Sequence, residues 1–200
     1  LAQLFNDART GIAVAGTSGK STVTGMIATI LAEIGEDPTM INGGRLRNFI
    51  EDSGLFFSSF RCGRSDLFVA EMDESDGSIA HYTPSYAVLN NIALDHKSMD
   101  ELNALFGDYV ERATEAVIVN ADDEDVCDLI GSRSAKHIVR FSLEDRDAEF
   151  FAEGLSFKAE GVDFTLHIKG QDTSYPVSLY VPGRHNVSNA LAALSVAGQM

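Results

Sequence analysis

Two patterns of hydrophobic and polar positions divide this chain. Up to Phe141, short apolar runs alternate with longer segments in which apolar residues recur every three or four positions. The short runs are typical of buried strands, and the longer spacing is typical of helices with one apolar face. The pattern predicts strands at residues 12–15, 39–42, 66–71, 86–92, 116–119 and 137–141, and helices at residues 21–34, 99–114 and 122–130.

The order of these elements predicts the fold class. Strands alternate with helices throughout this part of the chain, as in units that join two parallel strands through a crossover helix. We therefore expect an α/β fold with a mostly parallel, doubly wound sheet over about residues 10–148.

The pattern changes after this region. Residues 149–182 carry short alternating runs, and Gly154, Gly161 and Gly170 separate them at hairpin-like intervals. This predicts a small antiparallel β subdomain packed beside the main sheet. A helix over residues 183–200 is expected to close a single domain that spans residues 1–200.

Composition and charge restrict the class of protein. The chain has 15 Lys and Arg against 30 Asp and Glu, a net charge of −15 that repels a nucleic-acid backbone. Two cysteines far apart in sequence, with no run of membrane-spanning length, lead us to expect a cytoplasmic protein without a nucleic-acid or membrane partner. A chain that begins at Leu1 and stops inside a helical pattern is expected to be a fragment of a longer protein.

A glycine-rich turn joins the first predicted strand to the first predicted helix. Its sequence, GTSGKST, spans residues 16–22. Gly16 and Gly19 allow a tight turn whose amides, with the helix N-terminus, attract phosphate, as in P-loop folds. Lys20 is suited to a β- or γ-phosphate, and the Ser21 hydroxyl to the accompanying Mg²⁺. A turn that binds nothing is the alternative, but strand, turn and helix occur together.

Acidic and polar residues follow two other predicted strands. EMDESD, residues 71–76, begins at the carboxyl end of an apolar strand, where open α/β sheets bind their ligands. A solvated acidic loop is the alternative to a metal or phosphate site there. NNIALDH, residues 90–96, repeats the arrangement with Asp95 beside His96. A single histidine is usually structural, but this position favours a role for His96 beside a nucleotide-bound cation.

These motifs, together with PGRHNVSNALAA at residues 182–193, occur in the order and spacing of the ATP-dependent Mur ligases. Those enzymes build the peptide stem of peptidoglycan. The chain resembles their central ATPase domain, so the domains that hold the UDP-sugar and bring the amino acid would lie outside residues 1–200. Within the family it looks most like the UDP-N-acetylmuramate–L-alanine ligases and the related murein-peptide ligases.

The resemblance assigns a role to each motif. It implies catalytic roles for Lys20, Glu71, Asn91 and His96, and binding of two Mg²⁺ ions, one by Ser21 and Glu71 and the other by His96. It implies that the triphosphate is wrapped by Gly16, Thr17, Ser18, Gly19, Lys20, Ser21 and Thr22, with His185 and Asn189 on the adenine side.

The resemblance also implies a reaction. The partners would be ATP, UDP-N-acetylmuramate and an amino acid or peptide. A carboxylate would take the γ-phosphoryl group to give an acyl phosphate and ADP, and an amine would then displace phosphate to form an amide.

Alternatives remain open on the sequence. They are attachment of a murein tripeptide to UDP-N-acetylmuramate, a folylpolyglutamate-type ligase, and an ATP-binding paralogue without catalysis. Three departures from the common family pattern bear on the substrate. Ser18 replaces a frequent histidine, and Asn90 replaces the usual threonine. Lys97 and Ser98 follow the Asp-His pair where relatives usually have an apolar residue and Asp.

Overall fold

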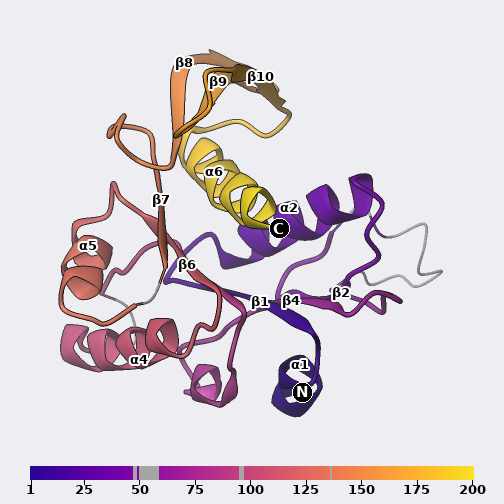
Figure 1. Cartoon of the computed structure of the whole chain (residues 1–200), viewed down its shortest axis with the longest axis vertical. Helices are drawn as coiled ribbons and strands as arrows, with labels where there is room; N and C mark the ends of the chain where they lie inside the picture. Colours follow the sequence, from indigo (N-terminus) through magenta and orange to yellow (C-terminus); the bar gives the residue numbers. More distant parts are fainter. Residues whose placement is uncertain (47–48, 50–58, 95–96, 136) are drawn as a thin grey trace.

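The computed structural model describes residues 1–46, 49, 59–94, 97–135 and 137–200. One ten-stranded sheet runs through it in the order β10-β9-β8-β7-β6-β5-β1-β4-β2-β3 (Figure 1). The strands are β1 (Thr10–Ala15), β2 (Thr39–Ile41), β3 (Phe60–Arg61), β4 (Leu67–Glu71), β5 (Tyr86–Leu89), β6 (Ala116–Asn120), β7 (Ile138–Ser142), β8 (Phe150–Lys158), β9 (Gly161–Ile168) and β10 (Ser174–Leu179).

The central part of the sheet is parallel. Strand β1 pairs in parallel with β4 on one side and β5 on the other, and the parallel pairing continues through β6 to β7. After β1 the chain builds β2, β3 and β4 on one side and then crosses to β5 on the other. The strand order therefore reverses at β1, where an open α/β sheet leaves a crevice at the carboxyl ends of its strands.

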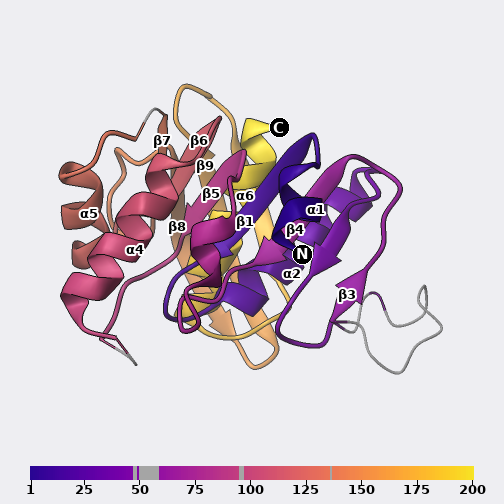
Figure 2. The same ribbon diagram turned by 90° about the horizontal axis from the view of Figure 1, so that it is seen from below.

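Helices cover both faces of this sheet. They are α1 (Ala2–Asn6), α2 (Lys20–Glu33), α4 (Met99–Glu111), α5 (Glu124–Gly131) and α6 (Arg184–Gln199), with a 3₁₀ turn η2 (Ser78–His81). Helices α2 and α6 pack together on one face, whereas α1, α4 and α5 lie on the other (Figure 1). From below, α4 and α5 lie side by side and α1 lies apart from them (Figure 2). None of the helices in the described ranges has the length and apolar content needed to span a bilayer.

The side chains of β1 show why both faces are apolar. Ile12 and Val14 join the core beneath α2 and α6, while Ala13 and Ala15 join the core on the side of α4. Successive strand residues point to opposite faces, so a strand covered on both sides has a continuous apolar run. The predicted fold class, a mostly parallel doubly wound α/β sheet with a small antiparallel part, is confirmed.

The antiparallel strands differ from the prediction in their placement. They extend the main sheet instead of packing beside it, because β8 pairs in parallel with β7 through Phe141–Phe150 and Ser142–Phe151. The prediction that Gly154 separates two strands is also wrong. Gly154 has a φ of +69° and lies inside β8, where the pairing with β9 shifts register. It therefore marks a bulge.

Strand β5 ends before the predicted boundary. It stops at Leu89, whereas the apolar pattern suggested an end at residue 92. The next residues, Asn90 and Asn91, turn toward the loop after β1 and hydrogen-bond to it. The polar residues therefore end the strand and place two amides in the crevice beside β1.

Candidate active site

The loop that leaves β1 depends on glycine at two positions. Gly16 has a φ of +132° and Gly19 a φ of +80°. A Cβ at Gly16 would lie 3.0 Å from the backbone oxygen of Asn91. A Cβ at Gly19 would lie 2.7 Å from both Asn189 Oδ1 and Asn90 Nδ2. Side chains are thus excluded by conformation and by space, and the backbone lies close to its neighbours.

Asn91 holds this loop. Its Oδ1 accepts hydrogen bonds from Thr17 Oγ1 at 2.9 Å and from the Ser18 amide at 2.8 Å. Its Nδ2 donates to the Ser18 carbonyl at 3.0 Å. One side chain therefore bonds to both polar edges of the turn, which fixes the direction in which the turn presents its remaining groups.

Asn90 connects the same loop to α6. Its Nδ2 donates to Asn189 Oδ1 at 3.0 Å and to the Ser18 carbonyl at 3.2 Å. Both asparagines are almost completely buried. His185 is exposed in the first turn of α6, one helical turn before Asn189. The predicted adenine-side residues thus share α6, and the buried Asn189 is linked to the loop after β1 through Asn90.

Lys20, the first residue of α2, points back over the loop. Its Nζ donates to the Gly16 carbonyl at 2.8 Å and lies 3.0 Å from Glu74 Oε2 in an ion pair. The Lys20 and Glu74 side chains are 16% and 10% exposed. The sequence predicted a metal or phosphate role for the acidic run at residues 71–76 that contains Glu74, but it did not predict the ion pair of Glu74 with Lys20.

Ser21 and Glu71 meet next to this ion pair. Ser21 Oγ lies 3.0 Å from Glu71 Oε1 and 2.8 Å from Oε2, so its hydroxyl donates to the carboxylate. The Gly43 amide also donates to Oε2 at 2.6 Å. The start of α2, the end of β4 and the loop after β2 thus place a hydroxyl and a carboxylate oxygen together. Oxygen donors of this kind are those that Mg²⁺ prefers.

A cavity of about 430 Å³ opens beside these groups. Its lining includes Asn42, whose buried side-chain nitrogen and oxygen have no hydrogen-bond partner in the structure as described. It also includes Asp73, whose pKa is held below its ordinary value by hydrogen bonds from Ser75. The full lining is Lys20, Ile41, Asn42, Gly43, Glu71 and Asp73. One lysine and two carboxylates therefore line space for a polar ligand, next to a buried amide without a hydrogen-bond partner, and these residues fit a phosphate with its cation.

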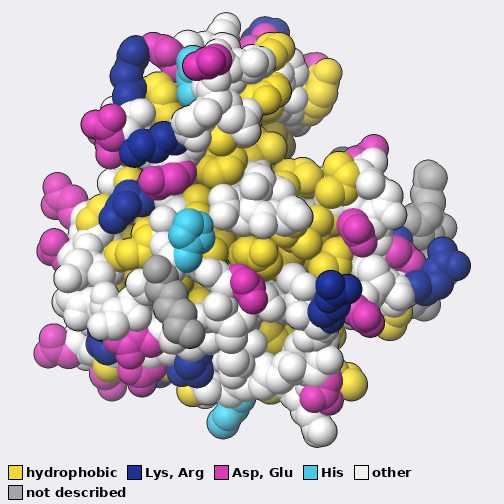
Figure 3. Space-filling view, viewed as in Figure 1, with side chains coloured by type: hydrophobic (Ala, Val, Ile, Leu, Met, Phe, Trp, Pro, Cys, Tyr) yellow, Lys and Arg dark blue, Asp and Glu magenta, His cyan; other side chains and the backbone are white. Residues whose placement is uncertain are grey.

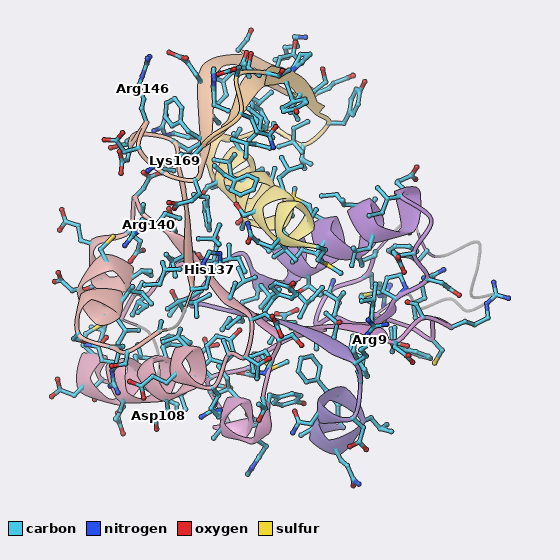
Figure 4. The ribbon with its side chains drawn as sticks, in the orientation of Figure 1. Arg9, Asp108, His137, Arg140, Arg146 and Lys169 are labelled. Carbon is cyan, nitrogen blue, oxygen red and sulfur yellow. The ribbon has the colours of Figure 1, made fainter. Side chains whose placement is uncertain are left out.

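Four other basic side chains, labelled in Figure 4, lie outside the lining of this cavity. Arg9 precedes β1, so it lies at the opposite end of that strand from the loop (Figure 4). Arg140 belongs to β7, and Arg146 and Lys169 lie in loops next to β8 and β9 (Figure 4). Of these side chains none lines the cavity, which leaves Lys20 as its basic lining residue.

Two predicted site residues, Thr22 and His96, are not among the described residues that line this cavity. His96, with its neighbour Asp95, lies outside the described residues. Thr22, together with Ser21 and Asn42, lines a second cavity of about 510 Å³ between α2, β10 and α6, where hydrophobic side chains gather on the surface (Figure 3). Over the described ranges no group of three or more His, Cys, Asp and Glu side chains could hold a metal ion. The candidate cation site rests on the contact between the Ser21 hydroxyl and the Glu71 carboxylate.

Comparison with known proteins relates this geometry to a family. The Mur ligase middle domain matches residues 14–197. The chain is 38% identical over 200 residues to the UDP-N-acetylmuramate–L-alanine ligase of Methylobacillus flagellatus, covering 96% of this chain and 40% of that protein. It is 36% identical over 197 residues to the enzyme of the same name from Persephonella marina, covering 95% of this chain and 40% of that protein. The chain thus spans about two fifths of the length of these relatives.

Solved structures agree with the sequence matches. A murein peptide ligase from Psychrobacter arcticus superposes with a TM-score of 0.84 at 30% identity, covering 99% of this chain and 45% of that one. A UDP-N-acetylmuramate–alanine ligase from Thermotoga maritima gives a TM-score of 0.76 at 26% identity, covering 94% of this chain and 40% of that one.

Proposed function

The chain belongs to the Mur ligase middle-domain family, and we therefore propose that it is the ATP-cleaving domain of an ADP-forming carbon–nitrogen ligase. One observation carries the proposal. The Ser21 hydroxyl and the Glu71 carboxylate meet beside Lys20 at the carboxyl ends of β1 and β4. A hydroxyl, a carboxylate and an ammonium group at a glycine-rich turn are the groups that phosphoryl transfer from a metal-bound nucleotide requires.

The proposed substrates are UDP-N-acetylmuramate and L-alanine. The names of relatives that are 36% and 38% identical to this chain support them. Those relatives are longer, so surfaces for the sugar nucleotide and the amino acid are assigned to flanking domains of the same protein. The proposed place of the reaction is the cytoplasm, in the synthesis of peptidoglycan precursors.

The chemistry that MgATP supplies when bound is transfer of its γ-phosphoryl group to the substrate carboxylate, after which an amine displaces phosphate and an amide forms. In this scheme Lys20 stabilises charge on the transferred group, and Ser21 with Glu71 holds one Mg²⁺. Asn91 fixes the loop that carries the backbone amides. His96 is proposed as a ligand of a second Mg²⁺ on the family resemblance.

The same scheme gives α6 a role in nucleotide binding. His185 and Asn189 are proposed on the adenine side, where an amide can pair with the N6 and N7 edge of the base. The bond from Asn90 to Asn189 supports this arrangement, because Asn90 also bonds to the Ser18 carbonyl and so links α6 to the loop that would hold the phosphates. Residues 16–22 would then surround the triphosphate.

A second candidate joins a murein tripeptide to UDP-N-acetylmuramate. Asn90 favours it, since the resemblance places asparagine here in the branch that recycles murein tripeptide. In this chain that asparagine bonds to both α6 and the loop after β1. The superposition on a murein peptide ligase, with a TM-score of 0.84, is compatible with either candidate.

Phosphate release by the full-length protein tests the proposal. The assay contains ATP, Mg²⁺ and UDP-N-acetylmuramate, with L-alanine, another amino acid or murein tripeptide added separately. Release that requires L-alanine supports the first candidate, and release that requires the tripeptide supports the second. Lys20→Ala should abolish the release, whereas Lys169→Ala, a matched change at a lysine outside the cavity, should leave it unchanged. Normal release by Lys20→Ala would refute the proposed site.

A further inference from the structure

The phosphate-loop lysine already has an anionic partner in this structure. Both carboxylate oxygens of Glu74 lie close to Lys20 Nζ, at 3.1 Å for Oε1 and 3.0 Å for Oε2. In the described structure Glu74 Oε2 is buried and receives no hydrogen bond, although it lies within ion-pair distance of Lys20. The charge of Glu74 is therefore balanced mainly by Lys20.

The burial of this pair makes each charge dependent on the other. The Lys20 side chain is 16% exposed and that of Glu74 is 10% exposed, so water solvates neither fully. An ion removed from water needs a partner of opposite charge, and leaving one partner alone is unfavourable. Glu74 therefore stabilises the ammonium group of Lys20 beside the cavity in the nucleotide-free protein.

The same ammonium group is the one assigned to the triphosphate. Lys20 already donates one hydrogen bond to the Gly16 carbonyl. A phosphate that approached it would stand next to the Glu74 carboxylate, and two anions at such short distance repel each other strongly in a partly buried site. Lys20 thus cannot keep its full interaction with Glu74 while it binds a phosphate.

We propose that Glu74 is a positioning residue whose carboxylate holds Lys20 until the triphosphate of ATP displaces it. This inference rests on the proposed function. Glu74 directs the lysine toward the cavity and lowers the affinity for the nucleotide, because binding must first separate the ion pair. The carboxylate is a competitor of the phosphate for one ammonium group.

Removal of the Glu74 charge should lower the stability of the nucleotide-free protein and raise its affinity for MgATP. Glu74→Gln keeps the size of the side chain and removes its charge. The nucleotide-free protein should become less stable, because Lys20 loses its counter-charge, and the affinity for MgATP should increase. A purely structural role would give only loss of stability with unchanged or weaker binding, so tighter binding separates the two explanations.

Isothermal titration calorimetry of the full-length protein with MgATP, without the other substrates, tests whether Glu74 competes with the triphosphate for Lys20. Glu74→Gln should bind MgATP about tenfold more tightly than the wild type, a change of about 1.4 kcal/mol. Binding of adenosine, which lacks phosphates, should not change. Glu74→Asp, which keeps the charge but withdraws it from Lys20, should give a smaller increase. Asp37→Asn is the matched control, because it removes a carboxylate from an ion pair with Arg61 that is remote from Lys20 in the described contacts.

The outcomes separate this inference from the proposed function. Wild-type protein that binds MgATP, together with Glu74 variants that bind it equally or more weakly, would overturn the role of Glu74 alone. Failure of the wild type to bind MgATP would overturn the proposed function and this inference with it. A tenfold gain shared by Asp37→Asn would also contradict the inference, since the gain would not depend on Lys20.

Discussion

Gly19→Ala should show how closely the phosphate loop is packed against its neighbours. The added Cβ would lie 2.7 Å from Asn189 Oδ1 and 2.7 Å from Asn90 Nδ2, at a residue whose φ is +80°. These two atoms form the hydrogen bond that joins the residue after β5 to α6, at 3.0 Å. The substitution therefore strains the backbone and forces apart the two partners of that bond.

Each effect has an expected magnitude. A left-handed conformation costs an alanine about 1–2 kcal/mol relative to glycine. Loss of one intramolecular hydrogen bond costs about 1 kcal/mol more. Gly19→Ala should therefore lower the free energy of unfolding by about 2–3 kcal/mol. It should also weaken MgATP binding, because the loop can no longer keep its present course.

Gly35→Ala is the matched control. Gly35 has a φ of +91°, and a Cβ there would meet nothing within 4 Å. It should cost only the conformational part, about 1–2 kcal/mol, and leave MgATP binding unchanged. Urea unfolding and nucleotide titration of both variants provide the measurement. Equal loss of stability in the two variants, with normal nucleotide binding by Gly19→Ala, would refute the close packing described for this loop.

Three further predictions concern the fold that carries the site. Ser98→Ala should cost about 1 kcal/mol in urea unfolding, because Ser98 forms the capping box of α4. Tyr109→Phe should cost about 1 kcal/mol in the same measurement, since the buried hydroxyl donates to the Ala13 carbonyl at 2.8 Å. A hydrogen bond from Arg64 lowers the pKa of Asp37 in the folded protein. The ionised carboxylate therefore stabilises the folded state at pH values above its unfolded pKa of about 3.9, and this stabilisation is lost as pH falls through the folded pKa. Asp37→Asn should make unfolding less dependent on pH in that acidic window, and an unchanged pH profile would contradict the assignment.

The sequence predicted the parallel strands of the sheet well because local pattern and burial agree. Strand β1 is covered on both faces, so its residues form an uninterrupted apolar run that is easy to recognise. The glycine-rich turn was recognisable because Gly16 and Gly19 occupy positions that a side chain would block. The family resemblance read from four motifs is confirmed.

The contacts that could not be predicted join residues far apart in sequence. Lys20 and Glu74 are 54 positions apart, and their ion pair depends on the course of the loop after β4. Asn90 and Asn189 are 99 positions apart, and their bond depends on how α6 packs beside α2. No local pattern encodes either distance.

The sequence around Ser98 contains the signal for a helix cap. Ser98 was noted as a departure from the family motif, but the structure gives it the capping box of α4 with Glu101. A serine followed three residues later by glutamate, before an apolar helical pattern, is the usual sequence sign of this cap. The departure at Ser98 therefore has a structural explanation in the start of the helix.

The central claim is that this domain uses ATP to activate a carboxylate for amide formation. Its most direct test is isotope transfer in the full-length protein, with UDP-N-acetylmuramate carrying ¹⁸O in its carboxylate, together with ATP, Mg²⁺ and L-alanine or murein tripeptide. If a phosphorylated carboxylate is formed and then displaced by an amine, one ¹⁸O atom must appear in the released phosphate for each amide made. Released phosphate without ¹⁸O, while ATP is consumed, would contradict the account.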